Sequence, residues 1–286
     1  MTISSEVLRY TAFTRDPQGG NPAGVLLDAT GVSPSHMQQI AADVGYSETA
    51  FLVPTGERTF AVRYFAPRAE VPFCGHATIA AAVAYAERAG DGPLHLDTPV
   101  GRVEVTTTAA GASAGQLVAA TLQSVPPDVK ELTPDDLTNL LAALGWSHED
   151  LDPHLPPRVA YAGAWHPILP VATRSRLAAL DYDFAQLGEL MALRGWTTVN
   201  LIWRESPRVF HARNPFPPGG VVEDPATGAA AAALGGWLRA LRLVEVPATV
   251  TVHQGADMGR PSLITVGIGA LEGSGIDVSG TAVAMG

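Results

Sequence analysis

The chain has very few cysteine and lysine residues, which many cofactor and metal sites require. Its 286 residues include one cysteine, Cys74, and one lysine, Lys130. A single cysteine excludes an intrachain disulfide and every metal site built from several thiolates. Lys130 follows the turn-rich segment Pro126-Pro127-Asp128 without a glycine-rich helix start before it. Neither a pyridoxal Schiff base nor a phosphate-binding loop is therefore indicated.

Basic clusters and long apolar runs are absent as well. The formal net charge is −10, and we expect neither nucleic acid nor an anionic membrane as a partner, since both need a basic surface. No apolar run is long enough to cross a bilayer, and Met1–Phe13 carries Glu6 and Arg9 where a signal peptide would be apolar. We therefore expect a cytoplasmic protein.

Several short patterns of the first half return in the second half, in the same order. Gly45-Tyr46-Ser47-Glu48 precedes the apolar run 50–53, and Gly195-Trp196-Thr197-Thr198 precedes the run 199–203. The other matches are Asn21-Pro22 with His166-Pro167, Val62 with Val209, Gly75 with Gly228, and Gly101-Arg102 with Gly259-Arg260. A period this long indicates two similar lobes. The alternative is chance recurrence in a chain with 29 glycines and 23 prolines.

Capping signals and periodicity predict the elements of both halves. Ser33, Pro34 and Gly45 mark the start and end of an amphipathic helix. Two Ala-rich helices, which include 79–86 and about 226–242, have no clear polar face and are expected to be buried. A further helix is expected near 183–194, and 107–117 has the composition of a tip or linker. Strands are expected at 6–13, 25–27, 50–53, 60–65, 94–96, 102–106, 118–123, 168–172, 198–203, 207–212, 248–253, 262–267 and 276–283.

These elements predict an α+β fold with two pseudo-symmetric lobes. Each lobe is expected to be a mostly antiparallel, β-barrel-like sheet around a central Ala-rich helix. We expect the N-terminal lobe to cover residues 1–115 and the C-terminal lobe 116–267, with 268–286 returning as a strand to the first lobe. The active site is expected in the cleft between the lobes.

Both Ala-rich helices begin in segments rich in glycine and hydroxyl residues, Cys74–Thr78 and Ala226–Ala229. A helix N-terminus presents unpaired N–H groups and about half a positive charge. It can therefore bind a carboxylate without any basic side chain. The alternative is ordinary capping, in which Thr78 and Thr227 satisfy these donors themselves.

A set of motifs extends over nearly the whole chain, from residue 20 to residue 262. They are Gly20-Asn21-Pro22-Ala23, Ser47-Glu48-Thr49-Ala50-Phe51, Pro72-Phe73-Cys74-Gly75-His76-Ala77-Thr78, Glu223-Asp224-Pro225-Ala226-Thr227-Gly228, and Gln254-Gly255 through Gly259-Arg260-Pro261-Ser262. In combination they resemble the phenazine-biosynthesis PhzF-like family. The resemblance implies a diaminopimelate-epimerase-like fold, cofactor-independent isomerisation by proton transfer, and commonly a homodimer.

The resemblance also implies roles for particular residues. Glu48 resembles the family's general acid/base, and His76 and Asp224 resemble its polar active-site partners. The two helix starts supply the substrate-binding positions Gly75, Ala77, Gly228 and Ala229. The family usually has Ser after the second of these glycines. Ala229 keeps the backbone N–H but lacks the hydroxyl, which puts in doubt the transfer of the founding member's substrate, a dihydro-hydroxyanthranilate.

The same residues also allow plainer interpretations. Glu48 could be a solvated loop carboxylate or a cap partner, but its repeat position holds Thr198, and an unmatched carboxylate favours a single acid/base group. His76 lies in a first helical turn, where the helix dipole disfavours its cation, so a neutral or purely structural histidine is expected. Asp224 could serve only to complement the charge of the second helix start.

Other site types find little support. In the wider epimerase fold a thiol at the position of Cys74 can act as a base, but a two-thiol racemase needs a second cysteine where this chain has Thr227. Cys74 is therefore expected to be a small buried residue. The remaining histidines lack metal-ligand spacing, and Gly267-Ile268-Gly269 does not fit a dinucleotide motif. We expect no cofactor and no metal.

The sequence thus predicts a cofactor-independent isomerase or epimerase. Glu48 would move a proton on a small carboxylic acid, while His76 and Asp224 position it. The alternative is a non-catalytic protein that binds small carboxylates on the same scaffold. A metal hydrolase is not favoured, because too few ligands are available.

Overall fold

The computed structural model describes residues 6–110 and 117–286 of the chain. It divides into two compact units, Met1–Gln123 with Ser279–Gly286, and Ser124–Val278. Strand β8 (Leu117–Gln123) packs in the first unit because it pairs along β7 (Gly101–Ala110). The first unit therefore extends beyond residue 115, where the sequence had placed its end.

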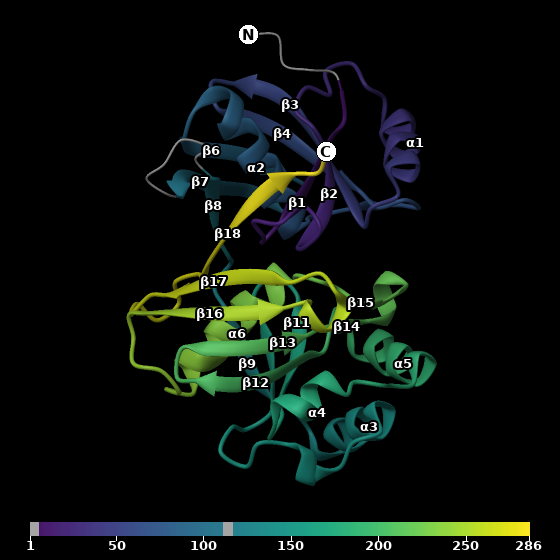
Figure 1. Ribbon diagram of the computed structural model, residues 1–286, viewed down its shortest axis with the longest axis vertical. Helices are drawn as coiled ribbons and strands as arrows, with labels where there is room; N and C mark the ends of the chain where they lie inside the picture. Colours follow the sequence, from purple (N-terminus) through teal and green to yellow (C-terminus); the bar gives the residue numbers. More distant parts are fainter. Residues whose placement is uncertain (1–5, 111–116) are drawn as a thin grey trace. The chain divides into compact units, whose positions relative to one another are not determined.

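The first unit is a closed barrel of mixed strands (Figure 1). Its order is β1-β2-β3-β4-β6-β7-β8-β18, and β18 pairs with β1 to close it. The pairs β2/β3 and β4/β6 are parallel, because a helix connects the strands of each pair. The sheet is therefore mixed, although most of its strand pairs are antiparallel, as the sequence predicted. The other strands are β1 (Leu8–Ala12), β2 (Asn21–Leu26), β3 (Glu48–Gly56), β4 (Thr59–Phe65), β5 (Glu70–Val71), β6 (Gly92–Thr98) and β18 (Asp277–Ala284).

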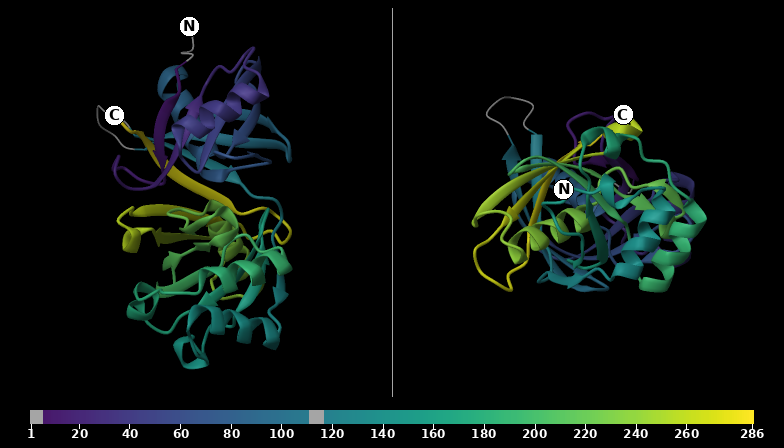
Figure 2. Two further views of the ribbon diagram at one scale, coloured as in Figure 1. Left: turned by 90° about the vertical axis from the view of Figure 1, so that its right-hand side faces the viewer. Right: turned by 90° about the horizontal axis from the view of Figure 1, so that it is seen from below.

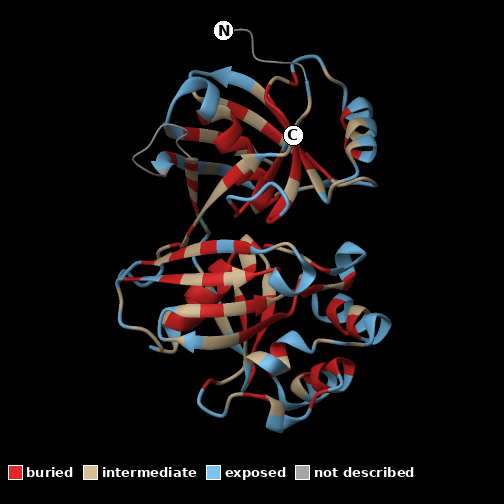
Figure 3. Ribbon diagram, in the orientation of Figure 1, coloured by how far each residue is buried: buried red, intermediate tan, exposed pale blue. Residues whose placement is uncertain are grey.

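Helix α2 (Gly75–Ala89) is the central element of this barrel. It contacts β1, β2, β3, β7 and β8, and most of its residues from His76 to Ala86 are buried (Figure 3). Alanine side chains allow the surrounding strands to approach the helix closely. The predicted buried Ala-rich helix is confirmed, and it begins at Gly75, within the segment where its start was expected.

Helix α1 (Pro34–Val44) follows its sequence signals closely. The Ser33 hydroxyl accepts a hydrogen bond from the His36 N–H at 3.3 Å, and Gly45 ends the helix with φ +73°. Met37 and Ala41 are buried in a small apolar cluster with Phe51 and Phe65, which holds α1 against β3 and β4.

The second unit also has a sheet packed around one Ala-rich helix, α6 (Gly228–Ala240), which is buried over most of its length. Its sheet has the order β9-β10-β11-β12-β13-β16-β17, and α6 contacts β9, β10, β11 and β17 (Figures 1 and 2). The strands are β9 (Asp128–Glu131), β10 (Arg158–Tyr161), β11 (Trp165–Pro170), β12 (Asn200–Ser206), β13 (Val209–Arg213), β16 (Ala248–Gln254) and β17 (Ser262–Ile268), with a separate pair β14 (Pro215–Phe216) and β15 (Val221–Glu223).

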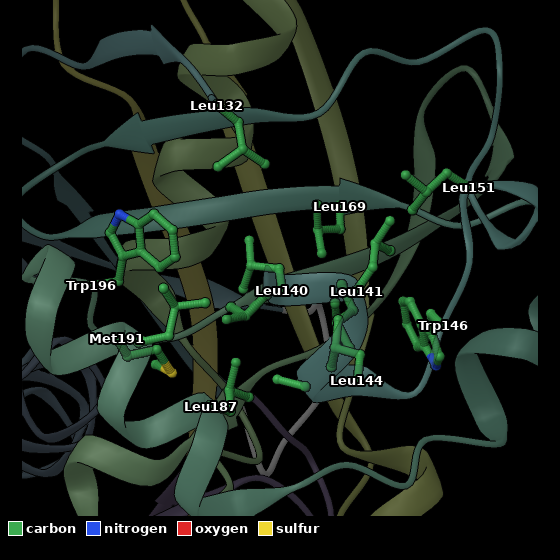
Figure 4. Packing of buried hydrophobic residues seen from close by; sticks show 14 of the residues in the cluster. Leu132, Leu140, Leu141, Leu144, Trp146, Leu151, Leu169, Leu187, Met191 and Trp196 are labelled. Atoms are coloured by element: carbon green, nitrogen blue, oxygen red, sulfur yellow. The ribbon is translucent and has the colours of Figure 1, made fainter. Parts of the chain in front are cut away.

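Helices α3 (Pro134–Leu144), α4 (Arg174–Ala178) and α5 (Phe184–Arg194) add a second core to this unit. Leucines of α3 and α5 pack with Trp196 and Leu169 (Figure 4). The sequence interpretation missed α3, yet Thr133 caps it and Gly145 ends it, as Ser33 and Gly45 do for α1. Short 3-10 turns lie at His148–Asp150, Pro217–Gly219 and Ala256–Met258.

The segment 107–117, expected as a linker, contains more strand than its composition indicated. Strand β7 continues to Ala110 and β8 begins at Leu117, while 111–116 lie outside the described residues. In the described part of the chain, no helix is both long and apolar enough to cross a membrane.

Strand pairing gives the repeat a firm register. In the first unit Phe51 pairs with Arg63, and in the second Leu201 pairs with Arg213, an offset of 150 in both strands. Each hairpin also has an irregularity at the corresponding place, between Pro54 and Gly56 and between Arg204 and Ser206. Gly45 and Gly195 share this offset and end the preceding helices, while Gly75 and Gly228 each begin the central helix of their unit.

Two matches from the sequence were out of register. Val62 corresponds to Ala212 and not to Val209, because Val62 pairs with Leu52 while Ala212 pairs with Ile202. In the parallel pairs Val25 aligns with Ala50 and Ile168 with Asn200. Counted two residues back from Val25 and Ile168, His166 corresponds to Ala23 and not to Asn21. Short apolar patterns fix the face of a strand but not its register to within two or three residues.

Candidate active site

Glu48 stands at the first position of β3, where the chain turns out of helix α1. Gly45 ends that helix in the left-handed conformation, and Ser47 and Glu48 follow after Tyr46. The side chain of Glu48 is 18% exposed, so it is largely enclosed but still reaches solvent. At the corresponding place in the second unit, Thr198 is fully enclosed.

Three chemically different side chains meet at the start of helix α2. The Cys74 thiol donates to Glu48 Oε2 at 3.5 Å, and Glu48 Oε2 lies 3.4 Å from His76 Nε2. The Cys74 sulfur also lies 3.3 Å from His76 Nδ1. The structure thus brings together Glu48 and His76, as predicted, and adds Cys74.

Asn21 and Ser47 define the state of His76. The Asn21 amide nitrogen lies 3.2 Å from His76 Nδ1, and an amide NH₂ can only donate, so Nδ1 accepts. The ring proton is therefore on Nε2, which faces the Ser47 hydroxyl at 3.3 Å and the Glu48 carboxylate. In this arrangement His76 Nε2 is the ring nitrogen that donates toward Glu48.

The two central helices differ from the others in how they begin. In α1, α3, α4 and α5 the side chain of the N-cap residue accepts a hydrogen bond from a backbone N–H of the first turn. These N-cap residues are Ser33, Thr133, Thr173 and Asp183. Neither Cys74 of α2 nor Thr227 of α6 makes such a bond. The Thr78 hydroxyl donates to the Cys74 carbonyl instead of capping the helix. A methyl group built on Gly75 would meet no atom within 4 Å, so the space before α2 is open.

Asp224, Gly228 and Ala229 belong to the second unit, at the start of α6. The Asp224 carboxylate accepts from the Thr227 hydroxyl at 2.7 Å. Gln254 donates to the Asp224 carbonyl at 2.7 Å and accepts from the Thr227 N–H at 3.2 Å. This network fixes the backbone in front of α6.

Glu223, the residue before Asp224, forms a buried ion pair with Arg213. The Arg213 guanidinium binds the Glu223 carboxylate through two nitrogens, with Nε at 2.6 Å from Oε1. The side chains are 12% and 3% exposed. Arg213 also donates to the carbonyls of Leu177 and Ala178. Such a charge pair is rigid because both groups are satisfied away from water.

A neutral polar chain lies behind the second helix start. His166 Nδ1 lies 2.9 Å from the Thr198 hydroxyl, which donates to Asn214 Oδ1 at 2.7 Å. The hydroxyl therefore accepts from Nδ1–H. Asn214 in turn donates to Asn200, and Asn200 donates to the Ala230 carbonyl of α6. Burial lowers the pKa of His166 to about 4, so the ring is neutral at pH 7.

Comparison with known proteins identifies the group to which this molecule belongs. A family model described as "Phenazine biosynthesis-like protein" matches residues 10–286. The chain belongs to this family. It is 32% identical over 256 residues to trans-2,3-dihydro-3-hydroxyanthranilate isomerase of Pseudomonas fluorescens, covering 88% of this chain and 86% of that protein. It is 29% identical to the uncharacterized isomerase YfhB of Bacillus subtilis (strain 168), covering 98% and 96%.

Solved structures of the family share the fold. The phenazine biosynthesis protein of the PhzF family from Bacillus anthracis aligns with a TM-score of 0.86 at 27% identity, covering 98% of this chain and 96% of the other. The relatives are named as isomerases, and this member of the phenazine biosynthesis-like family is an isomerase. The non-catalytic alternative is correspondingly disfavoured.

Sequence reasoning alone did not assign Cys74, Asn21 or Ser47 to this group. Asn21 and Ser47 stand in the motifs that resemble the family, but nothing in their spacing indicated contact with His76. Cys74 is buried as expected, at 8% exposure, yet its thiol is not merely a packing group. Of the three potential metal ligands, Cys74 and His76 share one segment, but Glu48 comes from another, so the clustering of all three could not be read as a spacing motif.

Proposed function

We propose that this isomerase acts without a cofactor, by proton transfer on a small carboxylic acid, with Glu48 as general acid and base. The observation that carries the proposal is the placement of Glu48. Its carboxylate is mostly enclosed, contacts two further titratable side chains, and lies beside a helix start that no side chain caps. A positioned carboxylate of this kind contributes about 10²–10⁴-fold to a proton-transfer step.

The uncapped start of α2 supplies a binding group for the acid. Backbone N–H groups in the first turn, including those of Gly75 and Ala77, can donate to the substrate carboxylate. When Glu48 removes a proton from the adjacent carbon, negative charge moves onto that carboxylate as an enolate. The same N–H groups and the helix dipole then stabilise the charge as it develops.

His76 and Cys74 have supporting roles in this scheme. His76 carries its proton on Nε2, next to Glu48, and the Cys74 thiol donates to the same carboxylate. Both contacts orient the carboxylate before it takes the substrate proton. The proton then returns from Glu48 to another carbon of the substrate, so no external donor is required.

The roles expected for Asp224, Gly228 and Ala229 in substrate binding stay predictions, as does a homodimer. The substrate in the name of the Pseudomonas fluorescens relative, trans-2,3-dihydro-3-hydroxyanthranilate, is the first acid to test. Ala229 makes closely related acids worth including, because this position lacks a hydroxyl donor.

The test is deuterium incorporation from D₂O into a panel of such acids, followed by mass spectrometry. We expect wild-type protein to exchange its substrate, and Glu48→Gln to lower the rate by about 10²–10⁴-fold. Glu57→Gln is the matched control, since Glu57 is exposed in the β3–β4 turn of the same unit. Equal exchange by wild type and Glu48→Gln would mean that another group moves the proton.

A further inference from the structure

The group at the start of α2 contains the three side-chain types that zinc prefers in proteins. Among the described residues, Glu48, Cys74 and His76 each offer one ligand atom, and these atoms all lie within 4.8 Å of one another. They supply a carboxylate oxygen, a sulfur and an imidazole nitrogen. Three protein ligands with a fourth position left for water is the usual composition of an open zinc site.

The spacing of these atoms already fits tetrahedral coordination. With Zn–S near 2.3 Å and Zn–N and Zn–O near 2.0–2.1 Å, ligand atoms on a tetrahedron stand about 3.3–3.6 Å apart. The Glu48 Oε2 to His76 Nε2 distance is 3.4 Å, and the Cys74 Sγ to Glu48 Oε2 distance is 3.5 Å. The Cys74 Sγ to His76 Nε2 distance is 3.8 Å. Only small side-chain shifts are required to hold an ion.

The charges and the surrounding groups agree with this fit. A thiolate and a carboxylate together balance the charge of a divalent cation. Zinc on His76 Nε2 places the ring proton on Nδ1. Asn21, which lies 3.2 Å from Nδ1, can accept that proton by turning its amide oxygen toward the ring.

We propose that Glu48, Cys74 and His76 bind Zn²⁺ and that the bound ion inhibits the isomerase. Binding forms a Zn–S bond and releases the thiol proton to solvent. It also occupies the Glu48 carboxylate, which then can neither take nor return a substrate proton. The binding step goes beyond the proposed function, because it requires no substrate and does not depend on which acid the enzyme isomerises.

Cobalt(II) is the probe for the test, since it takes the ligands that zinc takes and absorbs light when bound to a thiolate. We expect one equivalent of Co²⁺ to produce a thiolate-to-cobalt charge-transfer band in wild-type protein, and Zn²⁺ to remove it. Cys74 is the only cysteine, so the band reports this site alone. Mg²⁺, which prefers oxygen ligands, should not compete.

Cys74→Ser should lose the band and bind Zn²⁺ more than about tenfold more weakly. The control is His253→Asn in the second unit, where the rings of His211 and His253 stack at 5.0 Å beside Glu205. That variant should bind as wild type does. Absence of the band in wild-type protein, or equal zinc affinity in wild type and Cys74→Ser, would overturn the proposal.

Inhibition is measured separately, by deuterium exchange with and without Zn²⁺. We expect zinc to abolish exchange and a chelator to restore it. Exchange that continues with the site saturated would overturn the inhibitory role. Because cobalt binding is read without substrate, failure of the Glu48 mechanism and failure of the metal site give different results.

Discussion

An arginine–glutamate pair occurs at corresponding positions of the two units, but in different surroundings. Arg63 binds Glu70 in the first unit, and Arg213 binds Glu223 in the second. In each unit the glutamate lies on a short antiparallel strand. Glu70 is opposite Phe65, and Glu223 is opposite Pro215, which stands 150 residues after Phe65. The first pair is 37% and 35% exposed, whereas the second is 12% and 3% exposed.

The difference follows from what the second unit adds around its pair. Three extra residues lengthen the loop between Pro215 and Glu223, relative to that between Phe65 and Glu70. Tyr182 donates to the Val222 carbonyl across this loop. The same charged pair thus stabilises a solvated edge in one unit and fixes the approach to Asp224 in the other.

The N-terminal ends of the two central helices, α2 and α6, also differ in the side chains around them. The first has three titratable side chains close together, of which Cys74 and His76 are buried and Glu48 is partly exposed. Behind the second lies a closed, neutral chain from His166 to the Ala230 carbonyl. The corresponding strands of the two units thus carry different side chains, a titratable group in the first and a neutral hydrogen-bonded chain in the second.

The largest stability effect is expected from Arg213→Met. This change leaves the Glu223 carboxylate buried without its partner, and breaking such a pair typically costs about 3–5 kcal/mol. Urea unfolding monitored by circular dichroism measures the loss. The matched control is Arg63→Met, where screening by water limits the cost to about 0–1 kcal/mol. Similar losses in both variants would contradict the comparison.

A smaller effect is expected from acidification, through His166. The unfolded chain takes up a proton near pH 6.5, whereas the folded ring, with its pKa near 4, stays neutral. Stability should therefore fall as the pH drops from 7 to 5, by about 2 kcal/mol from this group. Comparison of urea unfolding at both pH values, for wild type and His166→Gln, measures this contribution. An unchanged pH dependence in the variant would rule out His166 as its source.

The smallest effects are expected at the two helix ends that correspond, Gly45 and Gly195. Both have positive φ, +73° and +66°, which alanine adopts only with strain. An added methyl group would meet nothing closer than 4.0 Å at either site. Gly45→Ala and Gly195→Ala should therefore each cost about 1 kcal/mol. Unfolding free energies that differ clearly between the two would mean that the repeat does not extend to these turns.

Local signals in the sequence predicted much of the fold. Helix α1 was predicted from Ser33, Pro34 and Gly45, because capping depends on neighbouring residues only. The buried nature of α2 and α6 followed from their lack of a polar face. Strand β7 was cut short because Thr107–Ala110 resembles a linker in composition, while its pairing with β8 is a tertiary property.

The sequence by itself determined the family and the two buried Ala-rich helices, and it placed Glu48 and His76 in motifs that the fold brings into contact. Only the tertiary structure decided that Cys74 and Asn21 join them, that Arg213 and Glu223 are buried, and that burial keeps His166 neutral. The physical reason is range. Caps and periodicity act within a few residues, whereas burial and side-chain contacts depend on strand register, which the folded sheet alone fixes.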